Sequence, residues 1–307
     1  MAQVLQKYVG RLAPSPTGAL HLGNVRTFMV AWLRARSQGG RLIMRMEDLD
    51  HPRDKPGAAQ AALDELKWLG FDWDVEFVQS ERKAKYREAL EALKAQGLVY
   101  PCTCSRRDVE AAQSAPHAGE QLHYPGTCRG RHPVYVPGAC WRFKVESPCL
   151  VEFDDVFAGR QRMDVAAKLG DFPLARDEFG AGYTLAAAVD DAEMGITEVV
   201  RGDDLIPATP PQILVQRALG LATPAYCHLP LLVGTDGRRL AKRHGDSRIA
   251  AYRGQGLAPE AIVGYLAWRS GLVPENAPVT LASLLPHFSL ARIPAHPCVL
   301  ADTGLMR

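Results

Sequence analysis

The chain has 307 residues, of which 47% are hydrophobic and 23% charged, and its formal net charge is +2. These values are typical of a soluble globular protein with one large or two modest domains, and they exclude nucleic-acid binding driven by overall positive charge. No apolar run is long enough to span a bilayer, and the first ten residues lack the pattern of a secretion signal. We therefore expect a cytoplasmic protein without membrane contact.

Strand and helix patterns alternate from the start of the chain. A short apolar strand at 9–13 ends at Pro14 and Pro16, and Asn24 then opens a helix over 25–37. The same alternation continues with a strand at 41–46, helices at 58–69 and 81–96, a strand at 198–201, a helix at 210–219 and a strand at 227–232. This order predicts an α/β fold, a Rossmann-like doubly wound parallel sheet.

The pattern changes between residues 101 and 182, where the chain contains several cysteines and candidate strands at 140–145 and 150–156. We predict an inserted α+β subdomain at 101–182, which divides the catalytic domain into 1–100 and 183–245. Residues 246–307 read mostly as short helices, such as one at 259–270.

The segment from Pro14 to Asn24 has the composition of a phosphate-binding turn. A helix N-terminus presents unpaired N–H groups and a partial positive charge, which favour a phosphate. Gly18 and Gly23 let the backbone approach a ligand, His21 can donate to a phosphate oxygen, and Asn24 can cap the helix or bind the nucleotide. The alternative is a plain capped helix with a surface histidine.

A second segment, 237–245, is strongly basic and flanked by glycine. Its cationic residues are Arg238, Arg239, Lys242, Arg243 and His244. A lysine in such a loop can neutralise charge on a leaving pyrophosphate. The alternative is a solvated basic loop.

Together and in this order, the two segments resemble the HIGH and KMSKS signatures of class I aminoacyl-tRNA synthetases. The neighbouring segments 11–18, 45–50 and 199–204 are similar to the glutamyl-tRNA synthetase branch. Asn24 stands where the first signature has His, and Ala241 stands where the second has Ser. The resemblance implies that His21 and Lys242 are catalytic, and that ATP, with Mg²⁺ on its phosphates, is bound by Pro14, Gly18, His21, Gly23, Asn24, Leu240, Lys242 and Arg243.

A glutamate pocket needs an anion for the ammonium and cations for the carboxylates. Glu47 follows a predicted strand and suits the ammonium, whereas Arg11 and Arg201 can pair with carboxylates in a bidentate fork. Tyr183 offers a hydroxyl and an aromatic wall. By resemblance, these four residues and Ser15 match the glutamate-contacting positions of the family. Taken alone, each arginine reads equally as a surface salt bridge, Glu47 as a helix cap and Tyr183 as core.

Three cysteines, Cys102, Cys104 and Cys128, have spacing that suits a tetrahedral zinc site. The residues leave the fourth ligand open among Tyr124, His117, His123 and His132, and the family resemblance points to Tyr124. We expect one structural zinc ion per chain, because a small insertion gains folding energy from a metal. Three reduced cysteines without metal are the alternative.

Only residues 246–307 follow the lysine segment, which is enough for a short stem-contacting region and too little for an anticodon-binding domain. With segment 52–59, this short tail resembles a truncated paralogue family, the glutamyl-queuosine tRNA(Asp) synthetases. The resemblance implies tRNA-independent activation of L-glutamate with ATP to glutamyl-adenylate, then transfer to the queuosine base at position 34 of tRNA(Asp). We expect a monomer. The alternatives are an enzyme that charges a tRNA 3′ end, another adenylating enzyme, or a non-catalytic zinc- and RNA-binding paralogue.

Overall fold

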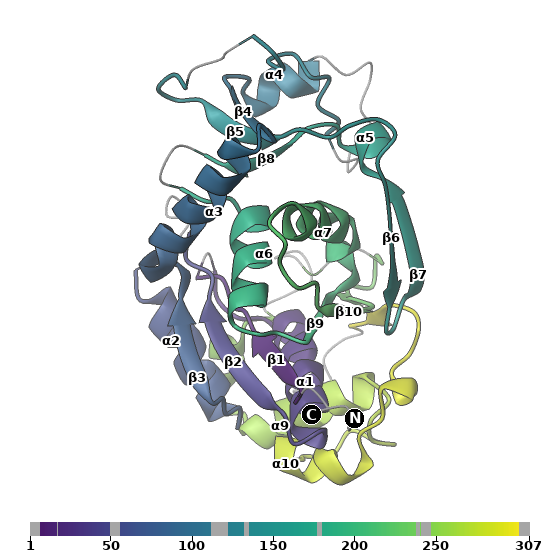
Figure 1. Cartoon of the computed structure of the whole chain (residues 1–307). Helices are drawn as coiled ribbons and strands as arrows, with labels where there is room; N and C mark the ends of the chain where they lie inside the picture. Colours follow the sequence, from purple (N-terminus) through teal and green to yellow (C-terminus); the bar gives the residue numbers. More distant parts are fainter. Residues whose placement is uncertain are drawn as a thin grey trace, which may run out of the picture.

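The computed structural model describes residues 7–16, 18–49, 56–111, 122–131, 135–176, 180–237, 240 and 247–300 (Figure 1). Its first half-sheet is formed by parallel strands in the order β1-β2-β3. The elements of this part are β1 (Val9–Leu12), α1 (Leu22–Ser37), β2 (Arg41–Met46), α2 (Ala58–Trp68), β3 (Val75–Val78) and α3 (Lys83–Ala95). Helix α1 packs on β1 and β2 through a fully buried face that includes Val25, Met29 and Leu33.

The second half-sheet has the order β7-β6-β10-β9, in which β6, β10 and β9 are parallel and β7 is antiparallel. Its strands are β6 (Leu150–Asp155), β7 (Gly159–Asp164), β9 (Glu198–Gly202) and β10 (Ala225–Leu229). The alternating prediction of an α/β fold with parallel strands is thus confirmed. Strand β6, which comes from the predicted insertion, joins the sheet by pairing Asp155 with Tyr226 of β10.

The two half-sheets meet where β1 lies beside β9. The Thr197 backbone N–H donates to the Val9 carbonyl at 2.9 Å, and the Arg11 Nη1 donates to the Val200 carbonyl at 2.8 Å. Strand order therefore runs outward from this junction in both directions. In open α/β sheets the crevice at the carboxyl ends of the strands, beside such a junction, is where ligands bind.

Helices α6 (Tyr183–Glu193) and α7 (Thr209–Ala218) pack together at the centre of the molecule (Figure 1). The sequence patterns did not predict α6. Below the sheet, α1 contacts α9 (Pro259–Arg269) and α10 (Leu281–Leu284), and α8 (Ile249–Gly254) precedes them in the chain. Short 3₁₀ segments complete the described helices at Gln79–Arg82, Asp203–Ala208, Leu285–His287 and Leu290–Arg292. None of the described helices is long and apolar enough to cross a membrane.

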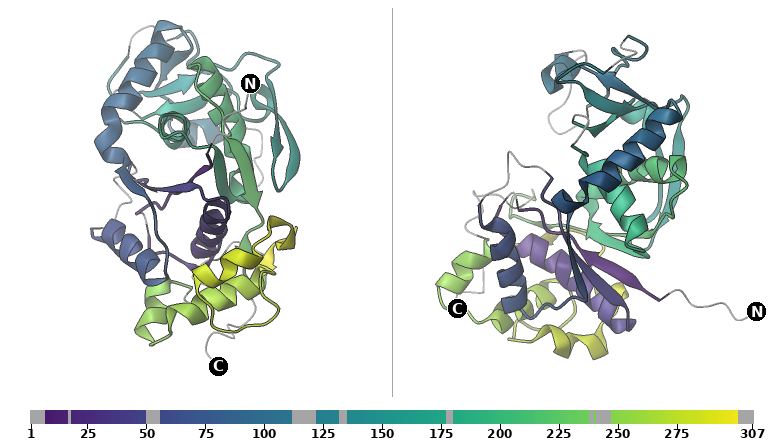
Figure 2. Two further views of the ribbon diagram at one scale, coloured as in Figure 1. Left: turned by 60° about the horizontal axis from the view of Figure 1, so that its bottom comes forward. Right: turned by 60° about the vertical axis from the view of Figure 1, so that its left-hand side comes forward.

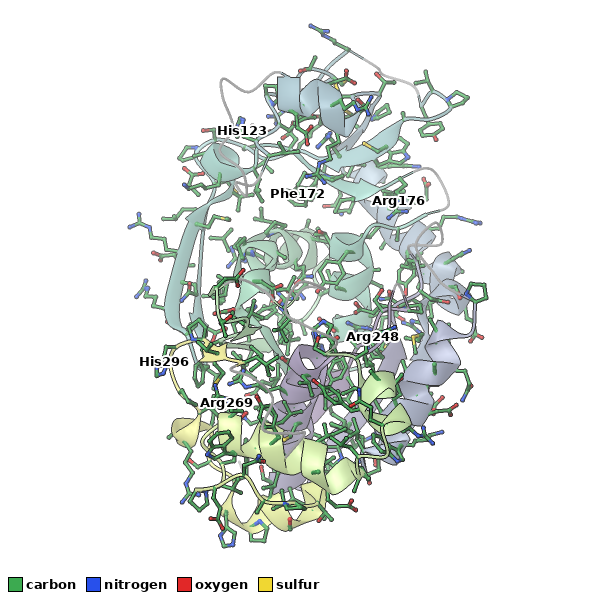
Figure 3. The ribbon with its side chains drawn as sticks, turned by 180° about the vertical axis from the view of Figure 1, so that it is seen from behind. His123, Phe172, Arg176, Arg248, Arg269 and His296 are labelled. Atoms are coloured by element: carbon green, nitrogen blue, oxygen red, sulfur yellow. The ribbon has the colours of Figure 1, made fainter. Side chains whose placement is uncertain are left out.

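A separate antiparallel sheet, β4-β5-β8, lies at the other end of the molecule from α9, and α3 leads toward it (Figure 2). In the view from behind, His123, Phe172 and Arg176 lie in this upper part, whereas Arg248 and Arg269 lie in the lower part (Figure 3). The elements here are β4 (Val99–Cys102), α4 (Arg106–Ala111), β5 (Cys140–Phe143), α5 (Val165–Lys168) and β8 (Phe172–Ala175).

The helix predicted over 25–37 begins earlier, at Leu22, and its cap is His21 rather than Asn24. The ends predicted for the other helices and strands differ from the observed ends by a few residues. For example, Glu81 and Arg82 form a 3₁₀ turn before α3 rather than its first turn. Such shifts arise because end residues are fixed by capping bonds rather than by apolar periodicity.

Helix α9 passes so close to the following segment that Gly264 has no room for a side chain. A Cβ there would overlap the carbonyl oxygen of Ala277. We expect Gly264→Ala to lower the free energy of unfolding by about 1–3 kcal/mol, measured by urea denaturation, because backbone must move to relieve the overlap. Gly254, in α8, has open space around its Cβ position, so Gly254→Ala is the matched control and should be neutral or slightly stabilising. Equal stability of the two variants would contradict this account of the α9 packing.

Candidate active site

A pocket of about 430 Å³ lies at the carboxyl ends of β1, β2 and β9. It brings together predicted residues from both ligand sets, namely Arg11, Ser15, His21, Gly23, Asn24, Glu47, Tyr183, Arg201 and Leu240. Pro14 and Gly18 are described but do not line it, and Lys242 and Arg243 lie outside the described residues. The pocket therefore joins the helix N-terminus to the predicted glutamate-contacting side chains.

His21 is the N-cap of α1. Its Nδ1 accepts from the backbone N–H groups of Gly23 at 3.2 Å and Asn24 at 3.4 Å. The Asn24 Oδ1 accepts in return from the His21 backbone N–H at 3.3 Å, which completes a capping box. Because Nδ1 is an acceptor, the ring proton of the neutral imidazole is on Nε2. Glycine at position 23 leaves room for the ring, since a Cβ there would lie 3.1 Å from Nδ1.

The segment that contains the second signature is anchored beside this cap at both of its described ends. Before it, β11 (Leu232–Val233) pairs in parallel with β12 (Cys298–Val299), and Leu240 lines the pocket. After it, the backbone of Arg248 forms an isolated antiparallel β-bridge with that of His21, and the Leu22 N–H donates to the Ser247 carbonyl at 3.0 Å. On one side of 241–246, Leu240 thus lines the pocket, and on the other side Ser247 and Arg248 pair with the start of α1.

Glu47 follows β2, and its backbone N–H donates to the Pro14 carbonyl at 2.9 Å. Its carboxylate accepts from Arg45 Nη2 at 2.9 Å, and Arg45 Nη1 donates to Asp191 at 2.6 Å. Burial raises the pKa of Glu47, although Arg45 and Arg11 oppose the shift. Burial also lowers the pKa of Arg45, but the adjacent Asp191 and Glu47 outweigh it and raise that pKa. This arrangement places the Glu47 side chain at the pocket wall, with its Oε1 bound to Arg45.

Arg11 and Arg201 place two buried guanidinium groups on the neighbouring strands β1 and β9. Burial lowers the pKa of Arg11, whose Nε lies 3.8 Å from Asp191. Arg201 Nη1 donates to the Tyr183 hydroxyl at 3.1 Å, which ties the strand to the first residue of α6. Two cations and one carboxylate around one cavity match the charges of an acidic amino acid.

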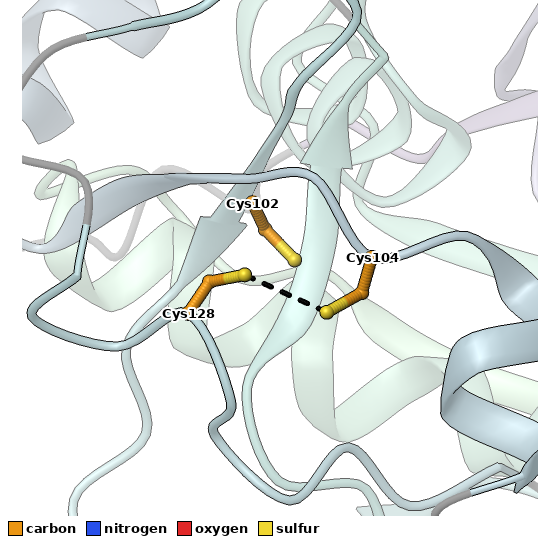
Figure 4. A group of neighbouring side chains, drawn as sticks. All are labelled: Cys102, Cys104 and Cys128. Carbon is orange, nitrogen blue, oxygen red and sulfur yellow. Dashed lines mark hydrogen bonds between the residues drawn. The ribbon is translucent and has the colours of Figure 1, made fainter.

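The three predicted cysteine ligands converge in the upper part of the molecule (Figure 4), where their sulfur atoms lie within 4.8 Å of one another. Sulfur ligands of a tetrahedral zinc ion lie about 3.8 Å apart, and the Cys104 and Cys128 sulfurs are 3.5 Å apart. The Tyr124 hydroxyl oxygen lies 3.2 Å from the Cys102 sulfur and 3.7 Å from that of Cys104. The three cysteines could therefore hold a metal ion, and the Tyr124 hydroxyl, which accepts from the Cys128 backbone N–H at 2.8 Å, lies beside them.

The surroundings of the cluster favour thiolate at Cys102, whereas burial raises the pKa of Cys104 to about 11. Arg142 Nε donates to the Cys102 sulfur at 3.2 Å, and a hydrogen bond from the Cys140 thiol contributes most to lowering the pKa of Cys102. The His123 Nε2 instead lies 3.2 Å from the Ala166 carbonyl, outside the group. His117 and His132 lie outside the described residues.

Comparison with known proteins gives the family. Residues 7–281 match the family described as tRNA synthetases class I (E and Q), catalytic domain. The chain belongs to this family, whose members are ligases.

The chain is 48% identical over 308 residues to a glutamyl-Q tRNA(Asp) synthetase of Symbiobacterium thermophilum, with 94% of each chain covered. It is 44% identical over 326 residues to a glutamyl-Q tRNA(Asp) synthetase of Rhodopirellula baltica, with 98% of this chain and 99% of that one covered. Among solved structures, a glutamate tRNA ligase from Elizabethkingia meningosepticum in complex with its amino acid superposes with a TM-score of 0.81. That match has 26% identity and covers 96% of this chain and 67% of the other.

Sequence reasoning missed three residues that support the pocket of this synthetase-family chain: Arg45, Asp191 and His228. Arg45 lies within a segment quoted for the family likeness, but nothing in the sequence shows that it faces Asp191, which is 146 positions away. His228 is a polar residue in an otherwise apolar strand, and that was the only available signal.

The cap on α1 gives a stability test that does not depend on catalysis. We expect His21→Ala to lower the free energy of unfolding by about 1 kcal/mol, because alanine offers no acceptor for the Gly23 and Asn24 N–H groups. His21→Asn keeps a capping side chain and should stay close to the parent protein. Chemical denaturation measures both, and an alanine variant as stable as the parent would show that the cap contributes nothing.

Proposed function

We propose that this chain activates L-glutamate with ATP without needing tRNA, and then transfers the glutamyl group to the queuosine base at position 34 of tRNA(Asp). The observation that carries the proposal is the single pocket in which the α1 N-terminus with His21 faces the charged set Arg11, Glu47 and Arg201. The printed names of the two relatives and their near full-length coverage support this acceptor.

In the proposed first step, the glutamate α-carboxylate attacks the α-phosphate of ATP and pyrophosphate leaves. Glu47 binds the ammonium, and Arg11 and Arg201 bind the carboxylates through charge-assisted hydrogen bonds. Tyr183 and Ser15 complete the amino-acid side of the pocket. Holding the attacking oxygen in line with the phosphorus supplies much of the rate acceleration by orientation.

The nucleotide side of the pocket stabilises the charge that develops on phosphate oxygens. His21, whose ring proton is on Nε2, and the N-terminus of α1 are the described donors. We assign Lys242 and Arg243 to the leaving pyrophosphate, since Leu240 before them lines the pocket and Arg248 after them pairs with His21. Mg²⁺ bound with ATP would neutralise the polyphosphate.

We assign a structural zinc ion to Cys102, Cys104, Cys128 and Tyr124. Bound metal would link β4 to the chain around Tyr124 and so contribute folding energy to this small sheet. Arg142 lies 3.9 Å from the Tyr124 ring and donates to Cys102, so it offsets negative charge at the site. We further propose that 101–182 is the insertion that carries the zinc, with its strands β6 and β7 forming part of the sheet of the catalytic domain.

A second acceptor is favoured by the structural match to a glutamate tRNA ligase, because the fold is shared over nearly the whole chain. Such an enzyme would charge the 3′ end of a tRNA. The amino-acid activation step is the same for both, so only the acceptor separates the two functions.

Pyrophosphate exchange and tRNA charging test the proposal in sequence. We expect exchange that depends on glutamate and needs no tRNA, because all the proposed amino-acid contacts lie within the chain. Labelled glutamate should then be transferred to tRNA(Asp) with queuosine, and neither to tRNA(Asp) without it nor to tRNA(Glu). His21→Asn should abolish exchange while it keeps the folded stability of the parent.

The outcomes separate the alternatives. Exchange with an amino acid other than glutamate would refute the pocket assignment. Charging of tRNA(Glu) at its 3′ end would replace the queuosine acceptor with the second candidate. If the folded parent protein catalysed no pyrophosphate exchange with any amino acid, the proposal that it is an amino-acid-activating enzyme would be refuted.

Metal analysis tests the zinc assignment. The parent protein should hold about one zinc ion per chain, and Cys102→Ser should lose it and unfold at a lower temperature, because serine is a poor zinc ligand. Cys149 directly precedes β6 and is not part of the group of candidate metal ligands found among the described residues, so Cys149→Ser is the matched control and should keep the metal. Full zinc content in Cys102→Ser would mean that the ligand set is wrong.

A further inference from the structure

Behind Arg201 lies a buried row of polar side chains that the proposed reaction does not use directly. Asp155, at the end of β6, lies with its Oδ2 2.6 Å from the His228 Nδ1, and both side chains are fully buried. The other ring nitrogen of His228, Nε2, lies 2.9 Å from the Arg201 Nε. Three neighbouring strands, β6, β10 and β9, thus each contribute one residue to the row.

The chemistry of these groups fixes where the proton lies. An arginine Nε–H can only donate, so the His228 Nε2 must accept from it and carries no proton. The proton of the neutral ring is therefore on Nδ1, which donates to the Asp155 carboxylate. A protonated imidazolium would place two N–H donors face to face. Burial lowers the pKa of His228, against the opposing effect of Asp155, which agrees with a neutral ring.

Asp155 is itself held rigidly as an anion. Its Oδ1 accepts from the backbone N–H groups of Phe157 at 3.0 Å, Ala158 at 2.7 Å and His228 at 3.0 Å. Burial raises the pKa of Asp155, but these bonds and the one from the imidazole outweigh it and lower the pKa. The carboxylate therefore has both oxygens engaged, and it has no freedom to rotate away from the ring.

The row determines the orientation of the Arg201 guanidinium. His228 accepts from Nε, Thr209 Oγ1 accepts from Nη2 at 2.7 Å, and Tyr183 accepts from Nη1 at 3.1 Å. A guanidinium has five N–H donors, so three bonds fix its plane and leave one N–H on each terminal nitrogen for a ligand in the pocket. Unused N–H groups on a guanidinium held in a fixed plane suit a carboxylate, which accepts charge-assisted hydrogen bonds from them.

From this geometry we propose that His228, oriented by Asp155, is a positioning residue that fixes the Arg201 guanidinium for a substrate carboxylate and so helps select an acidic amino acid. The inference deepens the proposed function and rests on it for the identity of the substrate. His228 itself touches no substrate in this account, because its ring lies behind Arg201 and does not line the pocket.

Two substitutions at His228 separate its two bonds. Asparagine places an amide N–H near the Nδ1 position, so His228→Asn keeps the donor to Asp155 and loses the acceptor for Arg201. Glutamine reaches the Nε2 position with its carbonyl oxygen, so His228→Gln keeps the acceptor for Arg201 and loses the donor to Asp155. Both variants remove the same ring and its packing, so each is the control for the other.

In glutamate-dependent pyrophosphate exchange, His228→Asn should raise the KM for glutamate about ten- to a hundredfold and leave the KM for ATP close to the parent value. His228→Gln should show a smaller rise, which is the rescue that a positioning role requires. If His228 only stabilised the fold, the two variants would show the same change in kcat, or the same change in the KM for glutamate and in the KM for ATP. Equal rises in the KM for glutamate in the two variants would overturn the proposal.

A third variant tests the role of Asp155 through the histidine tautomer. In Asp155→Asn, the amide oxygen can still accept from the backbone N–H groups, and the amide nitrogen then donates to His228 Nδ1. The ring proton must move to Nε2, where it opposes the Arg201 Nε–H. We expect a rise in the KM for glutamate comparable to that of His228→Asn, and an unchanged value would overturn the role given to Asp155.

Crystal structures of the His228 variants give a readout that does not depend on activity. Arg201 should be displaced or rotated in His228→Asn and retained in His228→Gln, and thermal unfolding shows whether each variant is folded. If the parent protein lacks glutamate-dependent exchange, the proposed function fails while the position of Arg201 still tests the inference. If the parent protein is active and Arg201 is unmoved in His228→Asn, the inference alone fails.

Discussion

Buried positive charge is the constraint around which this pocket is organised. Arg11, Arg45 and Arg201 are each at most 6% exposed, and an isolated cation at such depth is strongly disfavoured. Each one is compensated differently: Arg45 by two carboxylates, Arg201 by a neutral histidine backed by an aspartate, and Arg11 by a backbone carbonyl and the more distant Asp191. The positions of the acidic residues follow from this requirement, as does the close approach of β1 to β9.

The three arginines differ in how far nearby groups neutralise their charge, and this difference agrees with the roles proposed for them. Arg45 is neutralised by two carboxylates and does not line the pocket, so it acts within the protein, where it holds Glu47 and Asp191 in place. Arg11 has a buried Nε without a hydrogen-bond partner among the described atoms, and Arg201 lines the pocket and donates to neutral side chains, which leaves N–H groups unused. Groups with unused donors are the ones available to a negatively charged ligand.

The parts of the fold that repeat a local pattern were predictable from the sequence. Strands β1 and β2 and the helix between them follow apolar periodicity, and the turn that contains glycine and histidine indicates the start of that helix. The cap was assigned to Asn24 because asparagine is the commoner N-cap, whereas histidine takes that place here through its Nδ1. Helix α6 was missed because its run of alanines has little amphipathic contrast and its acids, Asp190 and Asp191, are buried by partners elsewhere in the chain.

The features that could not be predicted from the sequence depend on contacts between residues far apart in the chain. Asp155, Arg201 and His228 are far apart in sequence, and only strand order places them in one row. The same holds for Arg45 with Asp191, which no spacing rule can join. The predicted insertion shows this most clearly, because it supplies β6 and Asp155 to the sheet that carries the pocket.

The pairing of β11 with β12 ties the start of the basic segment to Cys298 and Val299, some of the last described residues. On the ribosome, chains are made from the N-terminus onward, so this pairing forms only after β12 has left the exit tunnel. The α1 turn and both half-sheets are synthesised much earlier. A nascent chain can therefore assemble the α1 cap and the strands around the pocket before β12 is available to hold β11, which precedes the basic segment.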